Sequence, residues 1–320
     1  MERVMPEGGA IGVDVGGTRI KAGRVDSAGR VIARDVVAVG EGRGEGEIVA
    51  RIAQAVERLD PGGALPVGLA AAGVIDVADG RVRESPNFPD WKDFDLAARV
   101  RRATGRAVAL ENDANAVIYG EAIAGAGRGA RTLVGYTLGT GVGGGIVLEG
   151  KIWHGVRGMA GELGHVTVAR DGRPCGCGNR GCLEQYAGQV GLRQTLRERG
   201  GAWARLADDA DAPARLAAMA EAGDGDAAAI YAEVGAMLGL AAAALVHTLD
   251  VQVIILSGGI AAASGLFVPA MEAELRARTF RSMSEGVAIR VGLLGADAGI
   301  VGAAALAGPL RAPEADAGVR

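Results

Sequence analysis

The sequence predicts an α/β fold built from two similar halves. Each half opens with strand-like segments separated by glycine-rich turns, and each continues with alternating helical and strand-like segments. Strands joined by tight turns form antiparallel meanders, whereas strands that alternate with helices predict a mixed sheet covered by helices. At 320 residues the chain is long enough for two such domains.

The first half begins with three predicted strands. An apolar run ends at Gly16 and Gly17, an alternating segment follows, and Ser27-Ala28-Gly29 turns the chain again. Helical periodicity follows a glycine-rich loop, and the apolar run between Pro66 and Gly73 predicts a buried strand. The expected elements are strands at 10–15, 20–25, 31–37, 67–71 and 107–110, and helices at 48–59, 94–103 and 114–124.

The second half repeats this plan. Two apolar runs separated by Thr-Gly-Val-Gly-Gly predict a hairpin, and a long apolar helix follows with Asp226 as its expected N-cap. The chain then alternates between helix and strand and closes with an alanine-rich helix. The expected elements are strands at 132–138, 145–148, 251–256 and 287–291, and helices at 226–248, 266–278 and 298–307.

Composition excludes several classes of protein. A net charge of −4 argues against a nucleic-acid-binding surface as the main function. The N-terminal segment lacks a secretory signal, so we expect a cytoplasmic protein with neither a nucleic-acid nor a membrane partner. All three cysteines lie within eight residues, which indicates metal binding or redox chemistry, not a disulfide framework.

Three glycine-rich loops are candidates for nucleotide binding. Asp14-Val15-Gly16-Gly17-Thr18 ends the first strand, where glycines let backbone N–H groups approach a phosphate and Asp14 could hold Mg²⁺ through water. The second loop runs from Leu138 to Gly145, and the third is Leu256-Ser257-Gly258-Gly259. Each alone is equally compatible with a plain turn. The second matches a dinucleotide-binding fingerprint formally, but a strand-like segment follows where that fingerprint requires a helix.

Carboxylates form the candidate catalytic cluster. Asp113, in Glu111-Asn112-Asp113-Ala114-Asn115, lies between a strand and a helix, where it could accept a proton from a hydroxyl group or simply cap the helix. Glu162 and His165 are three residues apart on a glycine-flanked loop, and Glu184 follows the cysteines. Ordinary surface or helix-start roles are the alternatives for these three.

The cysteines Cys175, Cys177 and Cys182 have the spacing C-x-C-x4-C, with glycines between them. Three thiolates need a fourth ligand for tetrahedral zinc, and His165 is the obvious candidate, with His154 and His247 the only other histidines. Such a closed site would be structural. Free thiols or a redox pair are the alternatives.

Taken together and in this order, the segments DVGGT, ENDANA, LGTGVGGG, ELGH, CGCGNRGC and LSGG resemble the ROK family of sugar kinases, and most of all its bacterial glucokinases. The resemblance implies the actin-like ATPase (ribonuclease H-like) fold, with two α/β domains around a cleft. It places the smaller domain at residues 1–112 plus 299–320 and the larger, zinc-binding domain at 113–298.

The resemblance also implies a role for each site residue. Asp113 would be the general base. Sugar would be bound by Gly73, Asn87, Asn112, Asp113, Glu162, His165 and Glu184. ATP with Mg²⁺ would be bound by Asp14, Gly16, Gly17, Thr18, Arg19, Gly139, Thr140, Gly141, Gly258 and Gly259. Structural zinc would be held by His165, Cys175, Cys177 and Cys182. Ala72 departs from the family pattern, which often has proline before this glycine.

The implied reaction is transfer of the ATP γ-phosphate to the 6-hydroxyl of a hexose, with glucose as the family's commonest substrate. Kinases of N-acetylglucosamine, N-acetylmannosamine, fructose, mannose and allose share these motifs, and polyphosphate is an alternative donor. The family also contains sugar-responsive repressors, but only about a dozen residues precede Asp14, fewer than a helix-turn-helix needs. A non-enzymatic sugar sensor stays an alternative. Relatives also imply a homodimer or homotetramer.

Overall fold

The computed structural model describes residues 9–41 and 43–307, and contacts divide the chain into two compact units. Among the described residues, unit 1 comprises residues up to 131 together with 145–161 and 293–307, and unit 2 comprises 132–144 and 162–292. Each unit contains layers of sheet and helix, as the sequence predicts.

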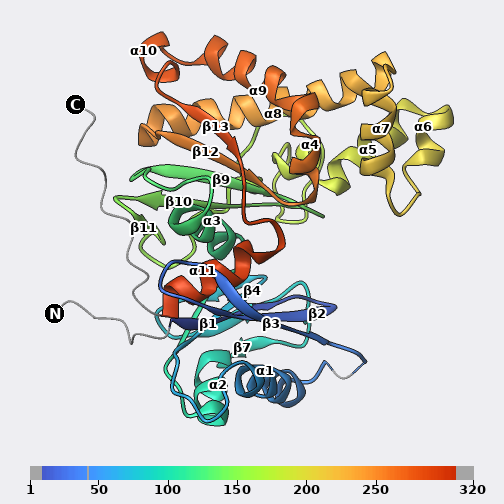
Figure 1. The fold of residues 1–320 in the computed structure, drawn as a ribbon. Helices are drawn as coiled ribbons and strands as arrows, with labels where there is room; N and C mark the ends of the chain where they lie inside the picture. The colour runs from blue at the N-terminus through green and yellow to red at the C-terminus, as the bar shows by residue number, and fades with distance from the viewer. Residues whose placement is uncertain (1–8, 42, 308–320) are drawn as a thin grey trace. The chain divides into compact units, whose positions relative to one another are not determined.

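Unit 1 is built on a five-stranded mixed sheet of order β3-β2-β1-β4-β8 (Figure 1). The strands β1 (Ala10–Val15), β2 (Arg19–Val25) and β3 (Val31–Ala38) form the predicted antiparallel meander. The strands β4 (Val67–Ala71) and β8 (Val108–Asn112) add to β1 in parallel. The carboxyl ends of β1, β4 and β8 therefore meet at one edge of the sheet.

Helices cover both faces of this sheet (Figure 1). The helices α1 (Glu45–Leu59) and α2 (Leu96–Thr104) pack on one face, and their apolar side chains join those of the strands in one buried core. The helix α11 (Ala298–Ala307) covers the other face, and α3 (Asp113–Ala124) packs against α11. Burial of these apolar faces is the main force that holds the layers together.

The alanine- and glycine-rich composition of α11 has a packing reason. A Cβ atom on Gly68 of β4 would lie 1.7 Å from the Ala303 carbonyl oxygen, and one on Gly302 would lie 1.7 Å from the Ala116 oxygen. The helix α11 thus approaches both β4 and α3 backbone to backbone. Larger residues at these positions would push the layers apart.

Unit 1 also holds a three-stranded antiparallel sheet that sequence patterning missed. Its strands are β5 (Val74–Asp76), β6 (Arg81–Glu84) and β7 (Lys92–Phe94). Beside it, the rings of Phe88 and Trp91 stack at a centroid distance of 4.0 Å, and Phe94 packs against Trp91. These three aromatic side chains are almost fully buried and anchor the small sheet to the main core.

A second five-stranded sheet has the order β11-β10-β9-β12-β13. In unit 2, β9 (Leu133–Leu138), β12 (Val253–Ser257) and β13 (Ala288–Val291) are parallel. The strand β10 (Val142–Leu148) follows β9 through the predicted hairpin, and β11 is Lys151–Ile152. The order places β9 and β12 next to each other, so their carboxyl ends are adjacent.

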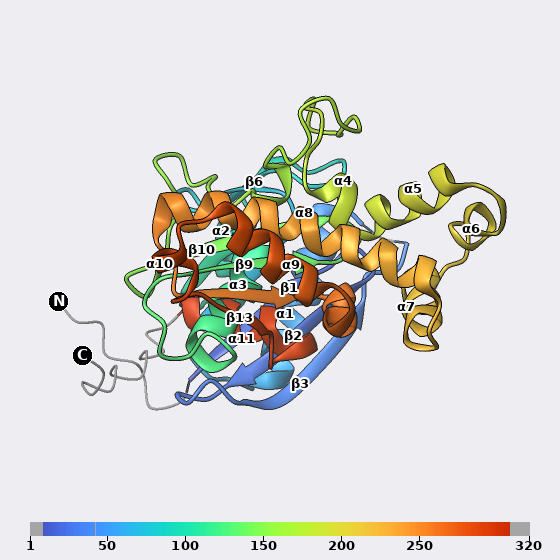
Figure 2. The same ribbon diagram turned by 90° about the horizontal axis from the view of Figure 1, so that it is seen from above.

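The helices of unit 2 centre on α8 (Gly225–Leu249), which packs along α9 (Ser264–Arg278). Figure 2 shows three shorter helices near the N-terminal end of α8: α5 (Gln189–Arg199), α6 (Gly201–Leu206) and α7 (Ala212–Glu221). The remaining helices of unit 2 are α4 (Glu184–Ala187) and α10 (Arg281–Ser284). By length and composition alone α8 could cross a membrane, but 56% of its most apolar window is buried inside the structure.

Most predicted elements are present, with small shifts at their ends. One predicted cap is wrong: Asp224, not Asp226, caps α8, because its Oδ1 accepts the N–H groups of Asp226 and Ala227. The predicted domain bounds stay a prediction. Their boundary at residue 113 would place α3 in the larger domain, whereas α3 packs on α11 within unit 1.

Candidate functional site

The sheet of unit 1 brings three predicted segments to one edge. Strand pairing aligns Val15 with Ala71, and Ala71 with Asn112. The glycine loop after β1, the Ala72-Gly73 turn after β4 and Asp113 after β8 therefore leave the sheet side by side. Ligands of open α/β sheets commonly bind beyond the carboxyl ends of the strands, so this edge is the natural place for a site.

Asn112 shapes the corner that carries Asp113. Its Oδ1 accepts the N–H groups of Ala114 at 2.9 Å and Asn115 at 3.1 Å, so Asn112 is the N-cap of α3. Its Nδ2 donates to the Gly73 carbonyl oxygen at 3.1 Å. Asp113 is the first residue of α3 and is partly exposed at this corner. The alternative that Asp113 itself is the cap is thereby removed.

Gly73 and Asn87 join the same edge. Gly73 has φ +124°, and a Cβ there would lie 2.0 Å from the Glu84 carbonyl oxygen, so only glycine fits. Asn87 lies against the first glycine loop, since a Cβ on Gly17 would be 3.1 Å from the Asn87 Oδ1. The structure thus places a predicted sugar-binding residue beside a predicted phosphate-binding loop.

The first glycine loop is a tight turn with a charged pair at its base. The Gly16 N–H donates to the Arg19 carbonyl oxygen at 3.1 Å, while Thr18 and Arg19 are exposed. The Asp14 Oδ2 lies 3.3 Å from the Lys21 Nζ, with both side chains accessible to solvent. A carboxylate and a cation beside an exposed glycine turn suit a metal-bound phosphate.

In unit 2 the second glycine loop, Gly139–Gly141, is held from two sides. The Gln189 and Val190 N–H groups at the start of α5 donate to the carbonyl oxygens of Gly139 and Thr140. From α4, Glu184 Oε2 accepts the Val142 N–H at 3.1 Å. A strand, β10, follows this loop, which confirms the rejection of a dinucleotide-binding fingerprint.

The third loop lies beside the second. Because β9 and β12 are parallel neighbours, Ser257 pairs with Thr137, and both loops follow directly. Gly258 has φ +92° and contacts the backbone of Leu138, whereas a Cβ on Gly259 would meet no atom within 4 Å. Unit 2 therefore brings Gly139–Gly141 and Gly258–Gly259 together at one sheet edge.

The cysteines and His165 form one cluster, in which all four ligand atoms lie within 4.8 Å of one another. The sulfurs of Cys177 and Cys182 are 3.7 Å apart, and the Cys175 sulfur is 3.6 Å from His165 Nδ1. Tetrahedral zinc with bonds of about 2.3 Å to sulfur and about 2.0 Å to nitrogen would set these separations at about 3.8 Å and about 3.6 Å. The donor set and its spacing therefore fit zinc.

Side chains around the cluster also favour thiolates. The Asn179 amide donates toward the Cys182 sulfur and the Gln185 amide toward the Cys175 sulfur. A backbone hydrogen bond at Asn179 lowers the pKa of Cys177. Burial raises the pKa of Cys182, because it disfavours the charged thiolate. The neighbouring thiols raise it further, to about 12, because several thiolates repel one another without a cation. His165 turns Nε2 toward Glu162, at 3.9 Å from its Oε2.

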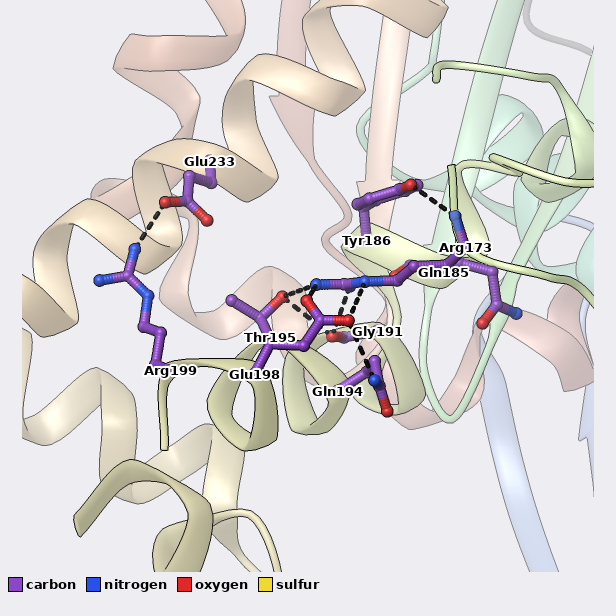
Figure 3. Close-up of polar contacts among 9 residues, drawn as sticks. All are labelled: Arg173, Gln185, Tyr186, Gly191, Gln194, Thr195, Glu198, Arg199 and Glu233. Carbon is purple, nitrogen blue, oxygen red and sulfur yellow. Dashed lines mark hydrogen bonds and ion pairs between the residues drawn. The ribbon is translucent and has the colours of Figure 1, made fainter. Parts of the chain in front are cut away.

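Arg173 fastens the cysteine loop to α4 and α5, as Figure 3 shows. Its guanidinium donates to the carbonyl oxygens of Gln185 and Gly191, to Thr195 Oγ1 and to the Glu198 carboxylate. Its N–H donates to the Tyr186 hydroxyl, whose ring lies 4.8 Å from the guanidinium carbon. Hydrogen bonds from Arg173 lower the pKa of Glu198. This anchor was not predicted.

Sequence reasoning also missed a second polar contact, which joins Glu111 to His154 at 2.5 Å. The two residues are far apart in the chain, and nothing in their local patterns links them. The predicted residues themselves fall into two groups: Asp14, Gly16–Arg19, Gly73, Asn87, Asn112 and Asp113 in unit 1, and Gly139–Gly141, Glu162, His165, the cysteines, Glu184 and Gly258–Gly259 in unit 2.

Comparison with known proteins identifies the class. The model of the ROK family matches residues 10–309. The chain is 37% identical to a glucokinase of Thermotoga maritima over 314 residues, which cover 94% of this chain and 98% of the relative. The chain therefore belongs to the ROK family.

Solved structures of that family share the fold. The ROK hexokinase of Thermus thermophilus matches with a TM-score of 0.80 and 34% identity, covering 93% of this chain and 97% of that one. A ROK glucokinase of Streptomyces griseus, solved with glucose and AMPPNP, matches with a TM-score of 0.77 and 34% identity, covering 94% and 99%. The predicted family and the predicted actin-like ATPase fold are confirmed.

Proposed function

We propose that this chain is an ATP-dependent glucokinase that transfers the γ-phosphate of ATP to the 6-hydroxyl of glucose. The observation that carries the proposal is the alignment of β1, β4 and β8, which sets the Asp14 loop, Gly73 and the Asn112–Asp113 corner at one sheet edge. The similarity of this chain to glucokinases, over nearly the whole length of this chain and of each relative, supports glucose as the acceptor.

Asp113 is the proposed general base. A sugar hydroxyl is a weak nucleophile, and a carboxylate that takes its proton as the new P–O bond forms assists the transfer. Asn112 fixes the corner through α3 and Gly73, so the Asp113 side chain starts from a rigid helix end. A rigid origin keeps the carboxylate aligned with the acceptor oxygen. Positioning of the reacting groups, together with charge neutralisation, supplies most of the rate enhancement in phosphoryl transfer.

ATP is assigned to the glycine loops. Gly16–Arg19 and Gly139–Gly141 would offer backbone N–H groups to the phosphates, and Gly258–Gly259 would lie along the adenosine. Asp14 would hold Mg²⁺, which neutralises charge on the transferred phosphate. Because Glu184 accepts the Val142 N–H, this proposed sugar ligand also supports the second phosphate loop. Glu162, His165, Asn87, Asn112 and Gly73 complete the proposed sugar site.

Zinc is the proposed metal of the cysteine cluster. Cys175, Cys177, Cys182 and His165 Nδ1 would hold it with no open position, so its role is to fold the 165–183 loop. His165 Nε2 stays available on the Glu162 side. The metal would thereby fix the ring that we assign to the sugar.

We also propose that the enzyme acts in the cytoplasm, in carbohydrate metabolism, as a homodimer or homotetramer. The domain bounds proposed from the family are 1–112 plus 299–320, and 113–298. Light scattering coupled to size-exclusion chromatography tests the assembly, and a monomer at micromolar concentration would contradict it.

The test of the function is a coupled assay of purified protein with ATP or polyphosphate against a panel of hexoses, with the product identified by NMR. Glucose and ATP should give glucose 6-phosphate. Asp113→Asn should lower kcat by about 10³-fold or more, while glucose binding measured by calorimetry stays within a few-fold. Unchanged turnover in this variant would remove Asp113 from the mechanism, and glucose binding without turnover in the wild type would indicate a sensor.

A further inference from the structure

Glu111 is a buried carboxylate directly before the proposed catalytic corner. It belongs to β8, and its side chain is only 2% exposed. Its Oε1 accepts the Asn112 N–H at 2.9 Å and the Asn115 Nδ2 at 3.0 Å, and its Oε2 lies 2.5 Å from His154 Nε2. A buried carboxylate without a cationic partner would be strongly unfavourable.

His154 is that partner. Among the residues that the structure describes, neither lysine nor arginine pairs with Glu111, so the protonated imidazole is the one cation placed to balance its charge. The hydrogen bond that His154 donates to Glu111 raises the pKa of His154, and partial burial opposes this shift. From β8, Glu111 is the charged group that faces the ring, and it is the one charged cause of this shift within the described part of the chain.

The backbone of His154 connects the pair to a loop. The Ala160 N–H donates to the His154 carbonyl oxygen at 3.0 Å and closes the segment 154–160. Gly158 in this segment lies beside β5, where a Cβ would be 3.8 Å from the Val77 nitrogen. Trp153 directly before this segment, and Val156 and Met159 within it, have exposed side chains. Polar contacts, not core packing, therefore hold this loop.

We propose that Glu111 and His154 are positioning residues for phosphoryl transfer: their ion pair holds the corner of Asn112 and Asp113 in register with the loop 154–160. Glu111 acts on the corner through the Asn112 N–H and through Asn115, and His154 acts on the loop through its carbonyl. Neither residue need touch the reacting atoms. The inference rests on the proposed kinase function, because it assigns a catalytic purpose to the corner.

The test compares His154→Gln, His154→Ala and Glu111→Gln with the wild type. Glutamine keeps an N–H near the position of Nε2 but carries no charge, whereas alanine removes both. We expect His154→Ala to lower kcat/KM about 10²-fold, as an acceptor corner misplaced by about 1 Å would. We expect the kcat/KM of His154→Gln to be at least about tenfold higher than that of His154→Ala. The double variant Glu111→Gln/His154→Ala should lose less than the sum of its single changes.

Two readouts separate positioning from general stability. The pKa of His154, followed by NMR of the labelled imidazole, should lie above the ordinary value of about 6.5 and fall back in Glu111→Gln. The pair is formed below the folded pKa and weakens as pH rises through it. The kcat/KM of the wild type should therefore decline as pH rises through that pKa. The pH profile of His154→Gln should lack this decline.

The outcomes that overturn the inference are distinct from failure of the proposed function. A His154 pKa at or below about 6.5 would overturn it, as would wild-type kcat and KM in His154→Ala. If the losses in kcat/KM among the variants follow only their melting temperatures, and His154→Gln shows no recovery, the ion pair stabilises the fold but does not position the catalytic corner. If the wild type phosphorylates no hexose, the kinase proposal fails. Glucose affinity and the His154 titration then still test the pair, and wild-type affinity in His154→Ala would contradict it.

Discussion

Single residues of this protein do two kinds of work at the candidate site. Some, such as Asp113, are proposed to offer atoms to a ligand, and others allow the backbone to adopt a shape that no other residue type permits. Gly73 is of the second kind, because its φ of +124° coincides with contact against the Glu84 carbonyl. Its own carbonyl oxygen then accepts the Asn112 amide, so backbone shape at one turn orients a side chain at another.

Gly73→Ala tests this link between backbone and site. We expect it to reduce the free energy of unfolding by about 2–3 kcal/mol, from the strained φ and the clash with Glu84, and to weaken sugar binding. Gly105→Ala is the matched control, because Gly105 also has positive φ, +70°, but a Cβ there meets no atom within 4 Å. It should cost about 1 kcal/mol and leave sugar binding unchanged. Urea unfolding and calorimetry measure both.

A result in which Gly73→Ala and Gly105→Ala lose equal stability and bind sugar equally well would contradict this assignment. The comparison works because both residues share the left-handed backbone and differ in their surroundings. Only Gly73 has a neighbouring carbonyl and a hydrogen bond that leads to the site.

At the scale of elements, the cysteine loop is a segment with little regular structure that is fastened to helices. Metal ligands would hold it internally, and Arg173 ties it to α4 and α5 (Figure 3). The Arg173 side chain is 15% exposed and its donors meet oxygen atoms from four residues, in a planar arrangement that lysine cannot reproduce.

Arg173→Lys should therefore loosen the loop. We expect a loss of about 2–4 kcal/mol in the free energy of unfolding, since several partly buried acceptors lose their donor. Bound zinc should also be released to a chelator at least several-fold faster, read with a colorimetric zinc indicator. The control is Arg199→Lys, because Arg199 makes a single ion pair with Glu233 (Figure 3). Its cost should stay below about 1 kcal/mol.

Equal rates of zinc release in the two arginine variants would show that Arg173 does not support the metal loop. Absence of zinc from the wild-type protein, measured by elemental analysis, would instead overturn the metal assignment. The two failures are separable because the first concerns a rate and the second a stoichiometry.

How far the sequence predicts these elements depends on the length of their patterns. Strands such as β1 and β12 and helices such as α1 and α8 have apolar periodicity over five or more residues, and all were predicted. The strands β5, β6 and β7 span three or four residues and include Arg81, Arg83 and Lys92, so no alternation can be read. Their stability comes from the adjoining aromatic cluster around Trp91, which packs into the core of the main sheet.

At the candidate site, too, contiguous patterns were predicted and long-range contacts were not. Local motifs identified the glycine loops, Asp113 and the cysteines, because each motif is contiguous and matches a known chemistry. Glu111–His154 and Arg173–Glu198 were not predicted, because each pair joins segments separated by 43 and 25 residues. Only the tertiary fold of unit 1, and the packing of the cysteine loop on α5, bring these partners together.

At the scale of the whole molecule, buried charge contributes to the stability of unit 1. Unit 1 contains a buried ion pair between Asp60 and Arg106, whose side chains are 12% and 3% exposed. Burial alone would raise the pKa of Asp60, but hydrogen bonds from Arg106 and the Leu65 N–H bring it below its ordinary value. The pair joins the end of α1 to the residue pair before β8, at the sheet edge opposite the candidate site, so it stabilises unit 1 without touching the site.

The last prediction follows from the sign of this shift. A depressed folded pKa contributes stability that is present above the ordinary value of 3.8 and is lost as pH falls through the folded pKa. Asp60→Asn should lower the free energy of unfolding of unit 1 at pH 7 by about 3 kcal/mol, because Arg106 stays buried without its partner. Its stability should then fall less steeply than that of the wild type below about pH 4.

Tryptophan fluorescence can assign this loss to one unit. Trp91 lies in unit 1 and is buried, and Trp203 lies in α6 of unit 2. In backgrounds that lack Trp153 and keep only one of these two, Asp60→Asn should shift the urea transition read at Trp91 and leave that at Trp203 in place. Transitions that shift together would show that the units unfold as one cooperative body, and the pH slope would then belong to the whole chain.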